Sequence, residues 1–302
     1  MNQNDFGKLV ASLRKEHENA DGSLWTQEKL AQEANLAAGT PIFSRDIICS
    51  IELGKRNPEG RMLVPMATAL ELTSHERKEF FLAASGVDNS EIACQENDPR
   101  ELYSQVTESI KELCVPAIVL DSYCNILAVN GILLTLIDFS QTTVIHENKY
   151  DPFRNPNLLL FIFSENGAEY LHKLMGEDFS NCAYAAINAF RAFSLAYRST
   201  QYFQDLLHEL RKFRLFKRYW SEIYFREKTY GVKNINIDVN SSNMGHLSVF
   251  ISFQTIFTKK GELHVFVLNP RNRDTADAFT RALEHSKTVI HLTAWPNENS
   301  LK

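Results

Sequence analysis

The sequence lacks the excess of positive charge that chain-wide binding to nucleic acid requires. Its 302 residues carry a formal net charge of -5, whereas nonspecific nucleic-acid binders are normally basic. The charge balance therefore disfavours a nonspecific, chain-wide binder. It leaves room for a small DNA-reading surface, because the distribution of charge matters more than its sum.

Paired cysteines are also missing. The five cysteines are widely spaced and no C-x-x-C pair occurs, so the sequence predicts neither a zinc site nor a disulfide framework. Reduced thiols in a cytosol are the simpler interpretation.

Long apolar runs are absent as well. The longest, such as Leu158 to Phe163, are far shorter than the roughly 20 residues that a membrane-spanning helix needs. The first residues show no basic segment followed by an apolar run, so no signal peptide is predicted. We expect a cytoplasmic protein without stable membrane insertion.

The sequence lacks the common catalytic signatures. No two of its twelve glycines are two positions apart, which excludes G-x-G-x-x-G, and neither a phosphate-binding loop, a G-x-S-x-G elbow nor H-E-x-x-H occurs. Cys124 or Cys182 with a distant histidine leaves a thiol nucleophile open, but a buried, inert cysteine is the favoured interpretation. We therefore predict no enzyme, no catalytic residue, no metal site and no cofactor.

Apolar residues make up 44% of the chain, enough for real cores, and the length suits two domains. Residues 1–86 show five apolar stripes at helical spacing. The second predicted helix runs from Gln27 to Ala34 after the N-cap Thr26, and a turn-like stretch follows at 35–41. The third runs from Ser44, its N-cap, to Leu53, and Gly54 and Gly86 end the third and fifth helices. We predict an all-α domain of five helices.

The polar segment 87–99 has no periodicity and is interpreted as a linker. The remainder, 100–302, is predicted to be an α+β domain with an antiparallel sheet. A linking helix over 102–113 comes first, then a hairpin of 117–120 and 126–129, and mostly helical residues over 131–215. Strands are expected at 234–239, 246–257 and 262–268, with a turn at 259–261 between the last two.

One motif lies in the second and third helices. The second helix opens with Thr26-Gln27-Glu28-Lys29-Leu30-Ala31. The segment that begins at Ser44 then carries, at set spacings, Ile48, Ile51, Glu52, Gly54, Arg56 and Pro58. The pair resembles the helix-turn-helix of the Xre/Cro repressor family, with Cys49 in place of a small polar residue and a longer turn. The resemblance implies a DNA-binding domain.

In a helix-turn-helix, the N-terminal residues of the second helix reach base edges in the major groove. Arg45 is suited to guanine, Gln27 to a phosphate, and Lys55 and Arg56 to phosphates just past the helix. The predicted DNA-binding residues are Gln27, Ser44, Arg45, Asp46, Ser50, Lys55 and Arg56. Residues 1–95 nevertheless hold 10 basic and 14 acidic residues, so we expect affinity to depend on a small basic edge and on a homodimer.

The second half carries a more diffuse resemblance. The hairpin Pro116–Asp121 and Asn125–Asn130 looks like the opening of a PAS-like fold. Further landmarks are Asn157-Leu158, Phe161, Phe190-Arg191, Leu206–Leu210, Phe216, Tyr219-Trp220 and Leu263–Pro270. Together they resemble the MmyB-like ligand-binding domain found behind Xre-type helix-turn-helix modules, over about residues 100–285.

This resemblance implies a cavity for a hydrophobic small molecule, with fatty acids as the favoured class. Such pockets are mostly apolar with a few polar anchors. The aromatic candidates are Phe153, Phe161, Phe163, Phe179, Phe190, Phe193, Tyr197, Phe250, Phe253 and Phe257. Arg191, Tyr197 and Arg198 are candidate anchors for a carboxylate. The predicted ligand-binding set is Phe161, Phe190, Arg191, Tyr197, Phe250 and Phe253. For each aromatic residue taken singly, a place in the core is the favoured interpretation.

A basic run extends from His208 to Tyr230, and the basic residues continue to Lys233. From residue 211 to residue 233 it holds eight basic and two acidic residues, interleaved with Phe213, Phe216, Tyr219 and Trp220. We interpret it as an amphipathic helix with a solvated basic face. Contact with an anionic membrane or with DNA is the alternative.

Taken together, these patterns predict a transcription regulator, of the type found in bacteria, that binds double-stranded operator DNA as a homodimer and senses an apolar ligand. One alternative is a DNA-binding regulator whose second domain only mediates dimerisation or protein binding. The other is an enzyme with a cryptic site.

Overall fold

The computed structural model describes residues 3–87, 98–137, 156–230, 236–258, 260–283 and 288–296. Most of the predicted linker at 87–99 therefore lies outside the described residues, as do Phe153, Lys233 and the Lys259 position of the predicted turn.

Five helices form the N-terminal region, as predicted. They are α1 (Gln3–Lys15), α2 (Gln27–Ala38), α3 (Arg45–Glu52), α4 (Gly60–Ala69) and α5 (Ser74–Ser85). Thr26 and Ser44 are the N-caps of α2 and α3, as predicted, because each side chain accepts a hydrogen bond from the backbone N–H three residues later. Gly86 ends α5 in the left-handed region, at φ 82°.

The prediction for the end of α2 was wrong. The helix continues four residues beyond Ala34, to Ala38, and ends at Gly39 with φ 67°. Residues 35–38 therefore form its last turn rather than a loop. Asn35, the first residue of the predicted turn, is helical, and its side-chain amide binds the backbone of Phe43 across the actual turn.

The first and third helices approach each other closely at Gly7. A Cβ built on Gly7 would overlap the backbone carbonyl oxygens of Ile51 and Glu52 at the end of α3. Only glycine allows this approach without a backbone shift. The orientation of α3 on α1 therefore depends on the missing side chain.

The C-terminal region contains one antiparallel sheet of six strands in the order β3-β4-β5-β1-β2-β6. The strands are β1 (Ala117–Asp121), β2 (Ile126–Asn130), β3 (Asn236–Ser241), β4 (Gly245–Thr258), β5 (Gly261–Pro270) and β6 (Val289–His291). The predicted β1–β2 hairpin and the three later strands are present, with ends shifted by a few residues. The sequence did not predict β6, which is only three residues long. The region confirms the predicted α+β, PAS-like class.

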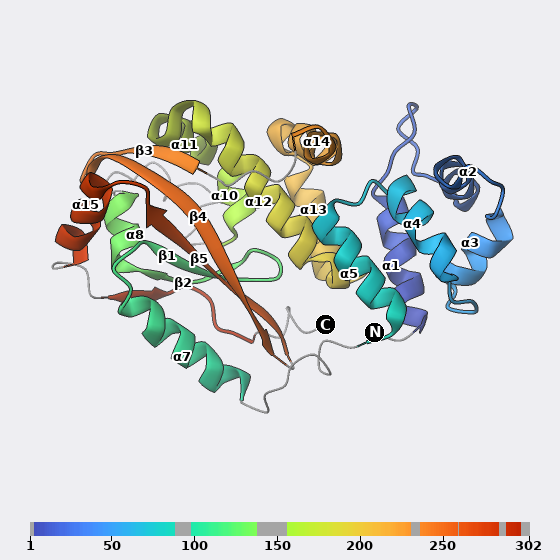
Figure 1. The fold of residues 1–302 in the computed structure, drawn as a ribbon, viewed down its shortest axis with the longest axis horizontal. Coiled ribbons are helices and arrows are strands. Elements are labelled where there is room, and N and C mark those ends of the chain that lie inside the picture. Colours follow the sequence, from blue (N-terminus) through green and yellow to red (C-terminus); the bar gives the residue numbers. More distant parts are fainter. Residues whose placement is uncertain are drawn as a thin grey trace.

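Helices cover both faces of this sheet (Figure 1). One face packs against α7 (Pro99–Lys111), the predicted linking helix, through Val106 and Ile110. Helices inserted between β2 and β3 lie on the other side of the sheet. Of these, α8 (Gly131–Leu136), α11 (Glu165–Met175) and α12 (Phe179–Phe193) contact strands, whereas α10 (Leu158–Phe163), α13 (Gln201–Leu210) and α14 (Arg214–Tyr230) pack mainly on other helices. Short 3₁₀ turns η2 (Gly176–Asp178) and η3 (Leu195–Tyr197) flank α12, and α15 (Arg273–Leu283) follows β5.

The basic run does not form one continuous helix. α13 ends at Leu210 and α14 begins at Arg214, with a turn between them. In α14, Phe216, Tyr219 and Trp220 are buried, whereas Arg214 and Lys217 are exposed. The predicted amphipathic division is thus present in α14 itself.

Buried apolar residues form separate clusters in the two regions, with one crossover. Leu195 of η3 belongs by sequence to the C-terminal region, but it packs in the cluster of the N-terminal helices and is 1% exposed. In Figure 1 the N-terminal helices adjoin the C-terminal region where α5 meets α12, and α5 also contacts η3. The two regions are therefore docked on each other.

Candidate functional site

The α2–α3 pair presents the start of α3 to solvent. Ile48 and Ile51 are 0% exposed and fix the inner side of α3, while Ser44, Arg45 and Asp46 are exposed at its N-terminus. Ser44 accepts a hydrogen bond from the N–H of Ile47 at 3.2 Å. The positive end of the helix dipole is thus directed outward together with the Arg45 side chain.

The turn between α2 and α3 is held by one side chain. Asn35 Nδ2 donates to the carbonyl oxygen of Phe43 at 2.9 Å, and the N–H of Phe43 donates to Asn35 Oδ1 at 2.8 Å. Phe43 itself is buried, at 6% exposure. This pair of hydrogen bonds fixes the start of α3 relative to α2 despite the length of the turn.

Gln27, at the start of α2, is held within the protein. Its Nε2 donates to Glu52 Oε2 at 2.8 Å, and Arg14 binds the same carboxylate with Nε–Oε1 and Nη2–Oε2 distances of 2.7 and 2.9 Å. Glu52 thereby joins α1, α2 and α3. The amide of Gln27 has a structural partner, and its predicted contact with phosphate stays a prediction.

Positive charge follows α3 directly. Lys55 is exposed, and Arg56 donates to Glu59 Oε1 at 3.1 Å in an ion pair whose side chains are 41% and 49% exposed. Ser50 is half-buried, and its carbonyl oxygen accepts from the N–H groups of Lys55 and Arg56. Exposed ion pairs such as Arg56–Glu59 contribute little to stability and exchange partners readily. Both cations therefore lie at the surface next to Arg45's helix.

The predicted ligand-binding residues do not lie together. Phe190 is 0% exposed in the core, stacked on Phe203 with ring centroids 5.6 Å apart. Phe161 is half-buried against Tyr170. Register places Phe250 and Phe253 on opposite faces of β4, because side chains alternate along a strand. Both are exposed, at 39% and 50%.

Phe253 belongs to an aromatic cluster beside the end of α12. Its ring stacks on Phe266 at 5.3 Å and meets Phe193 edge-on at 5.4 Å. Phe193 in turn lies flat on His264, with centroids 3.5 Å apart and planes at 8°. Sequence reasoning singled out Phe193 and Phe253 for their ring type but not His264, which a strand pattern of alternating residues does not distinguish.

His264 and Glu262 place two unusual titratable groups on the same strand face. Burial lowers the pKa of His264 to about 3, so its imidazole is neutral at pH 7. Its Nδ1 lies 3.1 Å from Thr255 Oγ1, and its Nε2 lies 3.6 Å from Glu262 Oε2. Burial, followed by the charge of Glu79, raises the pKa of Glu262 to about 7. The imidazole of His264 is thus uncharged at pH 7, whereas the carboxyl of Glu262 is only partly ionised there.

A small cavity lies at the same end of the sheet. Tyr197, another residue of the predicted ligand-binding set, lines it together with Asp121, Ser122, Tyr123, Lys260, Gly261, Glu262 and Trp295. Its volume is about 10 Å³, which is room for about one water molecule. A cavity of this size is too small to hold an acyl chain.

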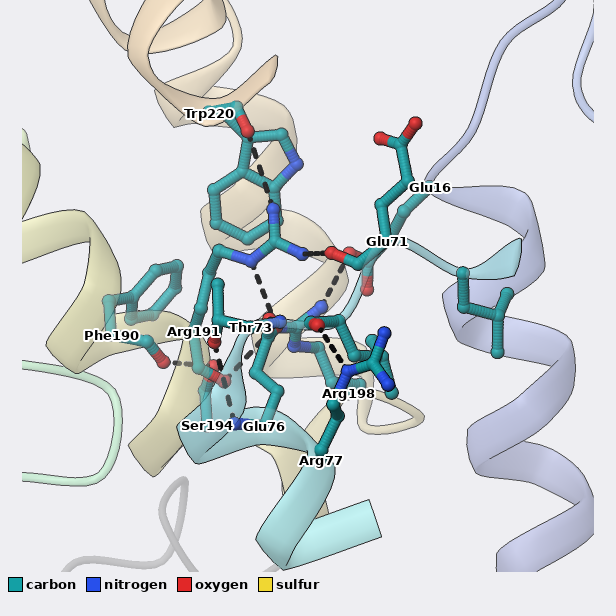
Figure 2. A network of polar contacts seen from close by, with 12 residues as sticks. Glu16, Glu71, Thr73, Glu76, Arg77, Phe190, Arg191, Ser194, Arg198 and Trp220 are labelled. Atoms are coloured by element: carbon teal, nitrogen blue, oxygen red, sulfur yellow. Dashed lines mark hydrogen bonds and ion pairs between the residues drawn. The ribbon is translucent and has the colours of Figure 1, made fainter. Parts of the chain in front are cut away.

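Arg191 lies where the two regions meet, as Figure 2 shows. Its Nε donates to Glu76 Oε1 at 2.9 Å, and its Nη2 to the carbonyl oxygen of Glu71 at 3.1 Å. Its guanidinium also covers the ring of Trp220, 4.9 Å from the centroid. The predicted anchor for a ligand carboxylate therefore binds a carboxylate of the protein itself.

Arg198 makes a second set of contacts at the same place. Its Nη2 donates to Glu76 Oε1 at 2.6 Å and its Nη1 to Glu16 Oε2 at 2.5 Å. Burial alone would raise the pKa of Glu76, but Arg191 and Arg198 lower it to about 2. We call Glu16, Glu76, Arg191 and Arg198 the junction. Two carboxylates of the N-terminal helices are neutralised there by two guanidiniums of the C-terminal region.

The sequence contains a signal for only part of the junction. Thr73-x-x-Glu76 has the capping-box pattern, and the structure shows both of its hydrogen bonds at the start of α5. No local pattern indicates that Glu76 also binds two arginines more than one hundred positions later. Pairing over such a separation is a property of the tertiary structure.

The state of the thiols and the grouping of possible metal ligands among the described residues bear on catalysis. They contain no group of three or more His, Cys, Asp or Glu residues that could hold a metal ion. Burial raises the pKa of the Cys124 and Cys182 thiols, which disfavours the nucleophilic thiolate. Within the same residues, no helix is long and apolar enough to cross a membrane.

Comparison with known proteins assigns the C-terminal region. The family described as "MmyB-like transcription regulator ligand binding domain" matches residues 105–282, more than half of the chain. None of the curated proteins matches the chain in sequence. The match covers strands β1 to β5, the helices between them and both arginines of the junction, whereas β6 lies beyond it.

Proposed function

The chain belongs to the family of MmyB-like transcription regulators with a ligand-binding domain, and we propose that it binds operator DNA through residues 1–86 and senses an apolar ligand through residues 100–302. The family is one of regulators rather than enzymes. The segment 87–99 connects the two parts in this proposal.

The exposed start of α3 supports the DNA-binding part. In a helix-turn-helix of the Xre/Cro type, the N-terminal residues of the second helix lie in the major groove. Arg45 and Asp46 are the first two residues of α3, and Lys55 follows the helix. All three residues are exposed. Arg45 is the residue suited to reading guanine, while Lys55 and Arg56 are suited to phosphates.

A binding selection tests this part. Duplexes are enriched from a random pool by the wild-type protein. The affinity of the wild type for an enriched duplex is then compared with that of Arg45→Ala, Lys55→Ala and the control Lys173→Ala, which changes an exposed side chain of α11. Because an arginine–base pair contributes about 1–3 kcal/mol, Arg45→Ala should weaken binding by about 5- to 150-fold. Lys55→Ala should lower the salt slope by about 1. No enriched duplex, or unchanged binding by both variants, would contradict the assignment.

The ligand-sensing part rests on the family and on the aromatic cluster of Phe193, Phe253 and Phe266. Half-exposed aromatic rings beside a buried polar group are the elements of a pocket for an apolar ligand. We propose fatty acids as the class. Native mass spectrometry of the purified protein, before and after organic extraction, should show loss of a bound mass of a few hundred daltons, as expected for a lipid.

The small cavity favours one alternative, in which the C-terminal region only dimerises or binds another protein. An extracted protein that shows no thermal shift with saturated fatty acids of different chain length would support it. For the DNA-binding form we propose a homodimer, since helix-turn-helix proteins bind half-sites about one helical turn apart.

A further inference from the structure

The segment from Phe190 to Arg198 contacts both regions of the protein. Phe190 and Phe193 point into the C-terminal region, where Phe193 covers His264. On the same nine residues, Arg191, Leu195 and Arg198 contact the N-terminal helices. A movement of the end of α12 therefore acts on both sides at once.

The contacts on the N-terminal side are buried and charged. The side chains of Glu76 and Arg198 are 0% exposed, and those of Arg191 and Glu16 are each 7% exposed. Salt screens such pairs far less than surface pairs. Removing one partner leaves an uncompensated buried charge, whereas removing a pair together does not. The docked arrangement is thus held by buried ion pairs, and separating the partners of such a pair costs free energy as soon as the charges lose each other.

Further hydrogen bonds connect the same two regions. The N–H of Ser74 donates to Glu227 Oε2 at 2.9 Å, and Arg211 Nη2 donates to the carbonyl oxygen of Glu16 at 2.8 Å. These contacts reach α5 and the end of α1. The N-terminal helices are therefore oriented by α12, η3 and α14 together.

The docked arrangement leaves the outer side of α3 free within the described residues. Ser44, Arg45 and Asp46 are exposed, and the junction contacts α1, the α4–α5 turn and α5 instead. Docking therefore does not act by covering this side of α3. It acts on the orientation of the N-terminal helices, which sets the spacing of two recognition helices in a dimer.

From these contacts we infer that the Phe190–Arg198 segment is the coupling element of the regulator, with the junction of Glu16, Glu76, Arg191 and Arg198 as its joint to the DNA-binding helices. This inference rests on the proposed function, because the coupling it describes is between the ligand-sensing region and DNA. Occupation of the region around Phe193 changes the position of the segment, and the arginines pass that change to Glu76 and Glu16. By linkage, DNA bound to the N-terminal helices acts on the same segment in return.

The test removes one ion pair without leaving a charge unpaired. In Arg191→Met with Glu76→Gln, methionine replaces the apolar stem of the arginine. Glutamine retains an acceptor for the N–H of Thr73 at the helix start. Arg198 and Glu16 still neutralise each other. The matched control is Lys173→Met with Glu169→Gln, an exposed pair on α11 with a 2.8 Å separation.

Scanning calorimetry of the full chain tests the joint without DNA or ligand. We expect one cooperative transition for the wild type and the control, and two transitions for the R191M/E76Q variant, the N-terminal helices melting first. Two transitions in the wild type, or a single unshifted transition in R191M/E76Q, would overturn the inference.

Hydrogen exchange tests the coupling, with the duplex enriched by the wild type as the probe. DNA should slow amide exchange in residues 190–203 of the wild type and the control but not of R191M/E76Q. Coupling between sites typically changes affinity by about 5- to 150-fold. The affinity of R191M/E76Q for the duplex should therefore differ from that of the wild type by at least about fivefold. Equal affinity with equal protection would overturn the inference. Failure to enrich any duplex would instead refute the proposed function, and calorimetry would still decide the joint.

Discussion

Arg198 and Glu76 form an ion pair across 122 positions of the chain, with Nη2 and Oε1 2.6 Å apart and neither side chain exposed. The other oxygen of Glu76 accepts the N–H of Thr73 at 2.8 Å and closes the capping box of α5. One carboxylate therefore both begins a helix and holds that helix against η3.

Arg198→Ala should destabilise the protein strongly. Because it leaves Glu76 and Glu16 with one guanidinium fewer inside the structure, we expect a loss of about 3–5 kcal/mol in the free energy of unfolding. Lys173→Ala, which breaks an exposed pair, should cost less than about 1 kcal/mol. Urea denaturation followed by circular dichroism measures both. Similar values for the two variants would show that the buried pairs contribute no more than surface pairs.

Alanine substitutions of Phe190 and Phe253 should differ in their effect on stability, because one ring lies in the core and the other at the surface. Phe190→Ala empties a fully buried position and should cost about 3–5 kcal/mol. Phe253 is 50% exposed, so Phe253→Ala should cost about 1 kcal/mol or less, while weakening any fatty-acid binding detected by native mass spectrometry. Unchanged lipid binding in a folded Phe253→Ala protein would remove this ring from the proposed pocket.

His17 should make stability fall in weak acid. Burial, followed by the charge of Arg191, lowers its pKa from 6.5 to about 4. Between these values the unfolded chain binds a proton that the folded protein does not, so stability rises with pH. The contribution lost between pH 7 and pH 4 is up to about 3 kcal/mol.

The variant His17→Gln isolates this effect. Gln can still donate to the carbonyl oxygen of Leu70, which lies 3.2 Å from His17 Nε2. The stability of the wild type relative to the variant should decrease from pH 7 to pH 4 in urea titrations at each pH. A difference that stays constant over this range would show that the imidazole titrates normally in the folded protein.

Asn35→Ala should loosen the connection between α2 and α3. It removes both hydrogen bonds to the backbone of Phe43, and we expect a loss of about 1–3 kcal/mol. Asn35→Asp keeps an acceptor for the Phe43 N–H but no donor, and should fall between the wild type and Asn35→Ala in thermal denaturation. The prediction fails if Asn35→Asp and the wild type are equally stable.

Local patterns predicted the elements that local physics determines. Thr26 and Ser44 were recognised as caps because a short polar side chain before an apolar stripe satisfies free backbone N–H groups. The β1–β2 hairpin followed from two apolar runs around Asp121 and Asn125. Both kinds of signal operate over a few residues, so one sequence is sufficient to find them.

The features that local patterns miss depend on contacts outside the segment itself. The stretch 35–41 is predicted to be a turn because it holds Gly39 and Pro41, yet its first four residues are helical and Asn35 bonds the backbone of Phe43. Strand β6 is too short for a periodic signal and is defined by its pairing with β2. The role of Arg191 as a ligand anchor stays a prediction, and its charge alone does not indicate that it also binds Glu76.

The junction also limits how freely the two halves of this protein can be recombined with those of others. The acidic partners, Glu16 and Glu76, come from the N-terminal helices, and the basic partners, Arg191 and Arg198, from the C-terminal region. A chimera that joins this C-terminal region to foreign N-terminal helices without those carboxylates would bury two unmatched cations. The two regions therefore complement each other in charge. Foreign N-terminal helices joined to this C-terminal region would need carboxylates at the positions of Glu16 and Glu76.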